Sequence, residues 1–227
     1  MGRSLSRRPP AGMISGWTFN HGDERDLGYA GNALTLDGAT NSGTNISLDG
    51  TNDRAFAPDD SFYTFGNGST DKPFSLSAWV YLDAYETGAD QILTKRTSAG
   101  GAGSAEWIFN VKSTGPQFGC YTTDGGAFIG SRGTATVSLS GWTHLVGTYS
   151  GGGVWTGFTL YAQGVVLSNN NISFGSYTAT GDTDQPVRVG SMDGTTRFLD
   201  GQMDDLRIYD RELTATEVAT IYQQGHR

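Results

Sequence analysis

Acidic side chains near the end of the chain are the first that could do chemistry. Asp204 and Asp205 stand side by side in Gly201–Arg211, a segment typical of a β-strand. Met203 and Leu206 would face opposite sides of a regular strand, so if both are buried the strand has a bulge at the two acids. Because bulges redirect side chains and often lie next to sites, this acidic pair is our first candidate for function.

A short helix is expected directly after this strand. Thr214 and Glu217 have the spacing of a capping box, in which each side chain satisfies a backbone N–H at the helix start. Val218, Ile221 and Tyr222 then form one apolar stripe at helical spacing. The glycine that follows is placed to end the helix.

The composition indicates a folded, acidic protein. The chain has 227 residues, with 34 Gly, 11 Phe, 10 Tyr and 5 Trp, and this aromatic content is not that of a disordered chain. The length suits one large β domain. The net charge of −8 disfavours nucleic-acid binding, which needs basic groups against phosphates, and is compatible with cation binding.

Cysteine and histidine chemistry is not predicted. Cys120 is the only cysteine of the sequence, so no disulfide forms within the chain, and a buried free thiol is expected. His144 lies in an apolar segment without a Cys or Ser partner, and His21 and His226 are far away in sequence. We therefore expect neither a zinc site nor a catalytic triad.

Residues 1–13 are interpreted as a basic arm that precedes the folded domain. They contain Arg3, Arg7 and Arg8, no acid and no hydrophobic periodicity. Such an arm is either a disordered tail or a partner-binding anchor that adds a strand to a neighbouring subunit. The arm lacks the apolar segment of a signal peptide, and no run approaches the roughly 20 apolar residues of a membrane-spanning helix. The sequence thus predicts a protein made and folded in a cytoplasm, without membrane insertion.

Short strands account for most of residues 14–227. Phe74–Leu82 alternates apolar and polar positions, Trp142–Tyr149 is a further strand, and Asn169–Asn171 is expected to be a polar loop. Roughly 12–15 strands at regular spacing favour an all-β sandwich or jelly roll. We expect one domain over 14–227.

Several segments, taken in order, resemble the laminin-G-like, concanavalin-A-like lectin/glucanase family. The matching segments are Trp17–Phe19, Asn45–Gly50, Phe74–Val80, Ile92–Lys95, Trp142–Val146, Leu160–Gly164, Val189–Gly190, Gly201–Arg211 and Leu213–Tyr222. Together they extend over about residues 14–223. The resemblance implies a jelly roll of two antiparallel sheets with one short C-terminal helix, acting as a binding module for glycans or proteins.

The resemblance also implies one structural Ca²⁺. Its ligands would be Asp26 and Asn32 in the loop after the first strand, and Asp204 in the late acidic strand. Oxygen atoms from carboxylates, amides and carbonyls are the ligands that Ca²⁺ prefers. The loop departs from the family pattern because it is short and carries Arg25, which could replace the cation as an ion pair. The alternative is a set of solvated turn acids with a hydrogen-bonded Asp204.

Glycoside cleavage is not expected. Glucanases of this family carry acids on one strand in the order Glu-x-Asp-x-x-Glu, and no such pattern occurs here. Glu212 and Glu217 have only the outer spacing, at the start of the expected helix, where capping explains them.

Aromatic side chains are the candidates for glycan binding. Trp155, Trp107 and Tyr121 could each stack on a sugar ring, with core packing as the alternative for each. Trp155 follows three glycines and is the one expected to be exposed.

The expected location of the protein follows from the absence of a signal peptide and the presence of the basic arm. A virion protein folds in the host cytoplasm, joins a particle and leaves by lysis. We therefore expect a phage or viral capsid decoration or fibre-type protein on the virion surface, held to other subunits by its arm and displaying a glycan-binding fold. The alternative is a free-standing extracellular lectin with a structural Ca²⁺.

Overall fold

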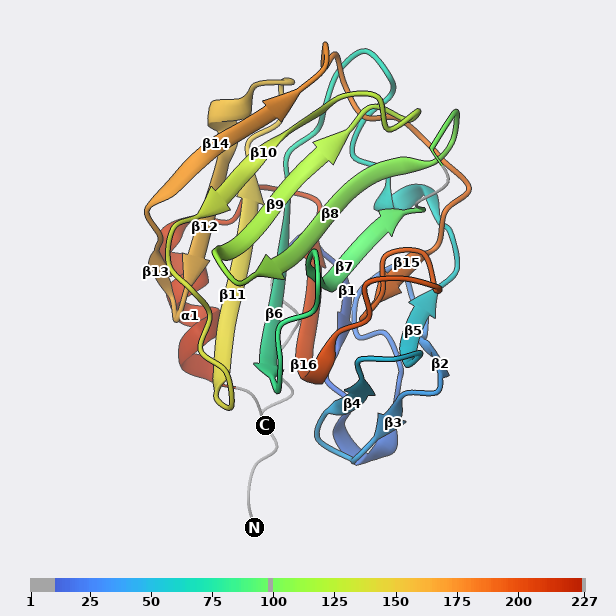
Figure 1. Cartoon of the computed structure of the whole chain (residues 1–227), viewed down its shortest axis with the longest axis vertical. Coiled ribbons are helices and arrows are strands. Elements are labelled where there is room, and N and C mark those ends of the chain that lie inside the picture. Colours follow the sequence, from blue (N-terminus) through green and yellow to red (C-terminus); the bar gives the residue numbers. More distant parts are fainter. Residues whose placement is uncertain (1–10, 98–99, 226–227) are drawn as a thin grey trace.

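The computed structural model describes residues 11–97 and 100–225 of the 227. In these residues, sixteen strands, one α-helix and three short 3₁₀ helices form two antiparallel sheets of eight strands each (Figure 1). The all-β sandwich with one C-terminal helix is therefore confirmed.

Sheet A has the strand order β13-β12-β11-β6-β16-β4-β3, and β1 pairs with β16. Its strands are β1 (Met13–Trp17), β3 (Thr40–Asn41), β4 (Ile46–Asp49), β6 (Phe74–Leu82), β11 (Trp142–Tyr149), β12 (Phe158–Ala162), β13 (Val165–Val166) and β16 (Asp200–Tyr209).

Sheet B has the strand order β14-β10-β9-β8-β7-β15-β5-β2 and lies in front in Figure 1. Its strands are β2 (Thr35–Asp37), β5 (Arg54–Ala57), β7 (Asp90–Arg96), β8 (Ala105–Lys112), β9 (Gly115–Tyr121), β10 (Phe128–Gly133), β14 (Asn169–Phe174) and β15 (Val187–Val189). The 3₁₀ helices are η1 (Asn20–Gly22), η2 (Ser61–Tyr63) and η3 (Trp155–Gly157).

The hydrophobic core lies between the two sheets. Alternate side chains of β6, from Phe74 to Leu82, belong to it, as the sequence pattern predicts. The Phe74 ring stacks on Phe65 with centroids 4.0 Å apart, and Tyr149 stacks on Phe158 at 4.0 Å. Such aromatic pairs add specific ring contacts to the burial of apolar area.

Helix α1 (Ala215–Gln224) packs on the outer face of sheet A. The expected capping box between Thr214 and Glu217 is present. Val218 and Ile221 are buried, and the Tyr222 ring stacks on Trp79 of β6 with centroids 5.7 Å apart. Within the described ranges α1 is the one α-helix, and no helix there has the length and apolar character to cross a membrane. Among the described residues, no α-helix lies over the outer face of sheet B.

Two local features test the strand predictions. The pairing of β16 with β6 shifts register between Asp204 and Arg207, and Asp205 has a left-handed backbone with φ 48°, so the predicted bulge is confirmed. The predicted loop at Asn169–Asn171 is wrong, because these residues begin β14, the edge strand of sheet B. Their polarity fits an edge strand with one solvent-exposed face.

Candidate functional site

The acidic pair at the bulge is engaged in contacts within the protein. Asp204 is buried, and its Oδ1 accepts a hydrogen bond of 2.7 Å from the Asp205 backbone N–H. Both carboxylate oxygens of Asp205 pair with the Arg207 guanidinium at 2.6 Å. That guanidinium also donates to Gln224 of α1 at 3.3 Å. The bulge thus fixes the helix to sheet A.

Asp26 organises the loop that follows β1. Its Oδ1 accepts the backbone N–H groups of Gly16 at 2.8 Å and Gly28 at 2.7 Å. Its Oδ2 accepts the Ser15 hydroxyl at 2.6 Å and the Asn32 N–H at 3.0 Å. Asp26 and Asn32 are therefore neighbours, as expected. The four donors occupy the roughly four lone-pair positions of the carboxylate.

This arrangement leaves no oxygen of Asp26 free for a cation. Asn32 donates its side-chain amide to Asp60 at 3.0 Å. Arg25 pairs with Asp23 and not with Asp26, so it does not take the place of a cation beside Asp26. Across residues 11–97 and 100–225, no group of three or more His, Cys, Asp or Glu side chains could hold a metal ion. As they stand, Asp26, Asn32 and Asp204 do not fit Ca²⁺, and the calcium site stays a prediction.

Asp26→Asn distinguishes the structural role of this carboxylate in the loop from a role as a calcium ligand. We expect the free energy of unfolding to fall by about 2 kcal/mol, because the new amide turns a donor toward Ser15 and Asn32. The loss should be equal in calcium and in chelator, measured by urea unfolding. If calcium raises the stability of the wild type but not of the variant, Asp26 is a calcium ligand after all.

The three aromatic candidates have different positions. Trp107 is fully buried in the core and donates its indole N–H to the Tyr63 carbonyl at 2.9 Å, so the expectation that it binds a glycan is corrected. Tyr121 lies on the outer face of sheet B, with 6% of its surface exposed. Trp155 is 50% exposed in η3, which contacts β10 and β14 at one edge of that sheet. Arg3, Arg7 and Arg8 lie outside the described residues.

A row of aromatic rings crosses the outer face of sheet B. Tyr121, Phe128 and Phe174 are directly paired on β9, β10 and β14. The Phe128 ring centroid lies 4.6 Å from Tyr121 and 5.8 Å from Phe174, whose ring is 51% exposed. The Arg96 guanidinium lies over the Tyr121 ring at 4.2 Å and donates to its hydroxyl at 2.7 Å. We call Tyr121, Phe128 and Phe174 the aromatic row.

A second row on the same face is made of polar side chains. It follows the cross-strand pairs of β14, β10, β9, β8 and β7, and its members are Asn170, Arg132, Gln117, Asn110 and Gln91. They face outward because their chain neighbours, such as Phe109, Val111 and Phe118, belong to the core. We call these five residues the polar row.

The polar row contains atoms whose hydrogen-bonding capacity is not used within the protein. Gln91 and Asn110 are only 1% and 2% exposed, yet Gln91 Oε1 and Asn110 Oδ1 have no hydrogen-bond partner among the described residues. The same holds for the Nε atoms of Arg96 and Arg132. Because buried polar atoms in proteins are nearly always paired, these atoms call for a partner other than the described residues, such as water, an ion or a ligand.

Two other places on the molecule are weaker candidates for a binding site. An open hollow of about 560 Å³ lies among the loops at one end of the sandwich, and it is lined by Ser61, Thr64, Gly66, Asn67, Gly68, Lys72, Thr123, Gly181 and Asp182. Ser77 and His144 are 3.0 Å apart, but both are fully buried and Tyr222 of α1 stacks on His144. Burial and the Arg207 charge lower the pKa of His144 to about 3, so it is a neutral core residue.

Comparisons with known proteins agree with this fold. The family model described as the concanavalin A-like lectin/glucanases superfamily matches residues 49–219. A comparison with curated proteins finds no match. Domain 4 of AbnA, an extracellular arabinanase from Geobacillus stearothermophilus, solved in complex with arabinotriose, has a TM-score of 0.64 at 18% identity, covering 93% of this chain and 98% of that one.

Two toxin domains have the same fold. The binding domain of Paraclostridial Mosquitocidal Protein 1 has a TM-score of 0.67 at 14% identity, covering 94% of this chain and 52% of that one. The botulinum neurotoxin serotype D binding domain has a TM-score of 0.59 at 12% identity, with 94% and 52% covered. This chain thus spans nearly all of the arabinanase domain and about half of each toxin domain.

The family match and the sandwich define a concanavalin A-like domain. The chain belongs to the concanavalin A-like lectin/glucanases superfamily, as a laminin-G-type member. The two toxin structures are binding domains, and the arabinanase domain was solved with an oligosaccharide. At this identity they support the fold, and the site is argued from this chain's own residues.

Proposed function

We propose that this domain is a non-enzymatic carbohydrate-binding module whose ligand lies on the outer face of sheet B. The observation that carries the proposal is the pair of unpartnered, buried amide oxygens of Gln91 and Asn110 in the polar row. Sugar hydroxyls donate hydrogen bonds to such oxygens, and the neighbouring aromatic row offers rings to the apolar faces of a sugar. The complex of the arabinanase domain with arabinotriose supports the same ligand class.

The absence of an acid pair on this face supports a binding role. On the described lengths of β14, β10, β9, β8 and β7, no acidic side chain faces outward. Asp90 is opposite the core residue Val111, and a bulge turns Glu106 inward to Lys95. Glycoside hydrolysis needs two carboxyl groups on either side of the scissile bond.

Asn110→Leu tests the site. Leucine has a similar size and removes the unpartnered oxygen, so we expect the free energy of unfolding to rise by about 1 kcal/mol. Affinity for the glycan selected on a glycan microarray should fall at least about tenfold. Binding that falls while stability rises identifies a ligand contact and excludes misfolding.

Two variants outside the two rows act as controls. Lys72→Ala alters the hollow at the loop end, and Trp155→Ala removes the exposed ring at the sheet edge. Each should bind the selected glycan within about twofold of the wild type. Loss of binding in Lys72→Ala alone would place the ligand in the hollow instead.

We also propose that the module works on a virion surface, as a capsid decoration or fibre-type protein held by its N-terminal arm. The support is the concentration of Arg3, Arg7 and Arg8 in residues 1–13 of an otherwise acidic chain. Replacing the three arginines by glutamine should abolish self-association or particle binding in sedimentation, with glycan binding unchanged. If the chain is monomeric with or without them, the free-standing lectin is the better proposal.

A further inference from the structure

The outer face of sheet B is basic, although the chain carries a net charge of −8. Lys112 follows the polar row at the end of β8, and Arg132 lies within the row. Arg197, on the loop between β15 and β16, lies against Gly88 just before β7, and its charge acts on Lys112. Arg96 lies over Tyr121. We call Arg96, Lys112, Arg132 and Arg197 the basic group.

The cations of this group have no carboxylate partner within residues 11–97 and 100–225. Burial lowers the pKa of the Lys112 ammonium, and the charges of Arg132 and Arg197 lower it further. Like charges gathered at a partly buried position repel one another, so an anion at Lys112 would be bound favourably.

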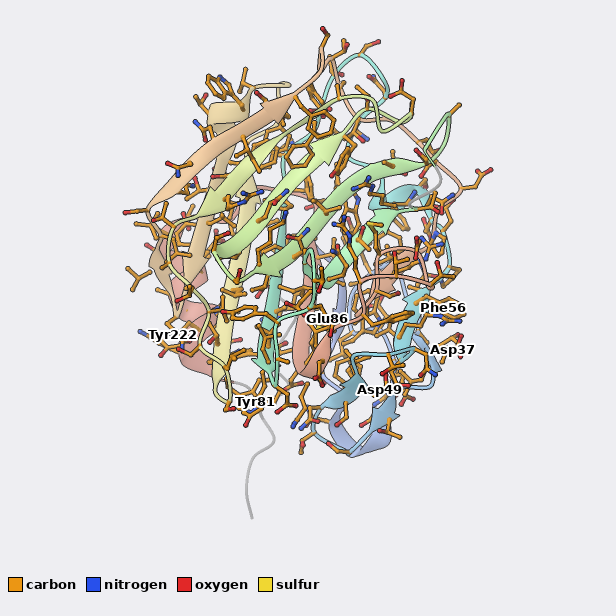
Figure 2. The ribbon with its side chains drawn as sticks, in the orientation of Figure 1. Asp37, Asp49, Phe56, Tyr81, Glu86 and Tyr222 are labelled. Carbon is orange, nitrogen blue, oxygen red and sulfur yellow. The ribbon has the colours of Figure 1, made fainter. Side chains whose placement is uncertain are left out.

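Acidic residues on the flanking elements interact electrostatically with residues outside the basic group. The charge of Asp193 acts on Arg188 of β15. Glu86, on the loop between β6 and β7 (Figure 2), acts on Asp90 and Asp200. Asp37, at the β2 end of sheet B (Figure 2), pairs with Arg54. On the five strands that carry the two rows, the only charged side chains that face outward are therefore cations.

The hydrogen-bonding pattern narrows the class of anion. The polar row offers unpartnered acceptors at Gln91 and Asn110, and the guanidinium of Arg132 offers an unpartnered donor. A sulfate ion carries no proton and cannot donate to the amide oxygens, and a phosphate ion has no apolar face for the aromatic row. A sugar acid has hydroxyl donors for the amides and a carboxylate or sulfate for the guanidinium, which binds such groups with two parallel hydrogen bonds.

We propose that the glycan bound on sheet B is an acidic oligosaccharide, with sugar rings at the aromatic row and an acidic group between Lys112, Arg132 and Arg197. This inference rests on the proposed function and names the substrate class of the same site. Nucleic acid is disfavoured as the occupant, because a long polyanion would also face the acidic remainder of a chain of net charge −8.

The test compares three polymers on the full chain by isothermal titration. Polygalacturonate supplies carboxylates, a heparin fragment supplies sulfates, and arabinan is neutral. Lys112→Gln, which lies outside both rows, should weaken binding of the acidic polymer about tenfold and leave binding of arabinan unchanged. Arg132→Gln should also weaken binding of the acidic polymer about tenfold, but it alters the polar row itself, so it is not used to judge arabinan binding. A preference for polygalacturonate identifies the acidic group as carboxylate, whereas a preference for heparin, which carries both groups, identifies sulfate as the group that adds affinity.

Arg25→Gln is the matched control, since it removes one positive charge from an exposed side chain on the loop after η1. It should bind all three polymers as the wild type does. Arabinan binding as tight as that of the acidic polymers, an equal loss in Arg25→Gln, or a duplex DNA affinity that depends on Lys112 would overturn the inference. Binding of neutral glycans alone would overturn it and leave the proposed function standing, whereas binding of no glycan would overturn both.

Discussion

Lys95→Met is expected to lower the free energy of unfolding by about 4 kcal/mol at pH 8, because it leaves the buried Glu106 carboxylate without its cation. The Lys95 side chain is fully buried and pairs with Glu106, which is equally buried. It also pairs with Asp59 at 2.8 Å and donates to the Thr183 carbonyl at 2.7 Å. One lysine thus connects two strands of sheet B to two loops.

The variant should also acquire a characteristic pH dependence. Burial already raises the pKa of Glu106 to about 7 in the presence of the Lys95 charge, which works in the opposite direction. Without that charge the folded-state pKa of Glu106 rises further. A raised carboxyl pKa means that stability is greatest below the unfolded pKa and is lost as pH rises through the folded one, so the variant should be closest to the wild type near pH 5.

Two further variants test whether the loss of stability comes from the buried ion pair. Lys95→Met/Glu106→Leu should recover part of the loss, because replacing both members of a buried ion pair by apolar residues is often close to neutral. Lys72→Met changes an exposed lysine and should alter stability by less than about 0.5 kcal/mol. Urea unfolding at pH 5 and pH 8 measures all three. A loss in Lys95→Met that the double variant does not reduce would contradict the pairing.

The sequence predicted those parts of the fold that local patterns control. The spacing of Thr214 and Glu217 marks the start of α1, because capping involves residues within one turn. The bulge at Asp204 and Asp205 follows from strand alternation once Met203 and Leu206 are both buried, since two side chains three residues apart cannot share a face of a regular strand.

The interior charges could not be predicted in the same way. Lys95 and Glu106 lie in strands where alternation alone does not show which face is covered. Glu106 points inward because it is the extra residue between the pairs Lys95–Trp107 and Arg96–Ala105. A bulge that depends on the partner strand leaves no signal in either strand by itself.

The candidate site was missed for a related reason. Its two rows contain one residue from each of several strands, so they exist only once the register of the sheet is known. Asn170 looked like part of a loop, although it lies directly opposite Arg132 in sheet B. Tyr121 alone was found from the sequence, because an aromatic residue is a candidate wherever it occurs, and for the same reason Trp107 was included wrongly.

Asp90→Asn should raise the free energy of unfolding at high pH, and after Lys95→Met it is the substitution with the largest expected effect on stability. Asp90 is fully buried at the start of β7, where its Oδ1 accepts the Glu86 N–H at 3.2 Å and its Oδ2 has no partner among the described residues. Burial raises its pKa from 3.8 to about 7, with the charges of Glu86 and Asp200 adding to the effect. The folded state therefore retains a proton that the unfolded chain releases.

The sign of the pH dependence follows from this proton. Wild-type stability due to Asp90 is fully present below pH 3.8 and is lost as pH rises toward 7. Asparagine is neutral at every pH and keeps an oxygen for the Glu86 N–H. Since each pH unit in this range corresponds to about 1.4 kcal/mol, the advantage of Asp90→Asn over the wild type should grow by about 3 kcal/mol between pH 5 and pH 8.

Urea unfolding of both proteins at the two pH values measures this growth directly. Asp184→Asn removes the same charge from an exposed position and should give a difference that hardly changes with pH. If the advantage of Asp90→Asn is the same at pH 5 and pH 8, Asp90 is ionised in the folded protein at both. A cation or an ordered donor at Oδ2 would then have to compensate its burial, because an unpaired carboxylate in this position is unstable.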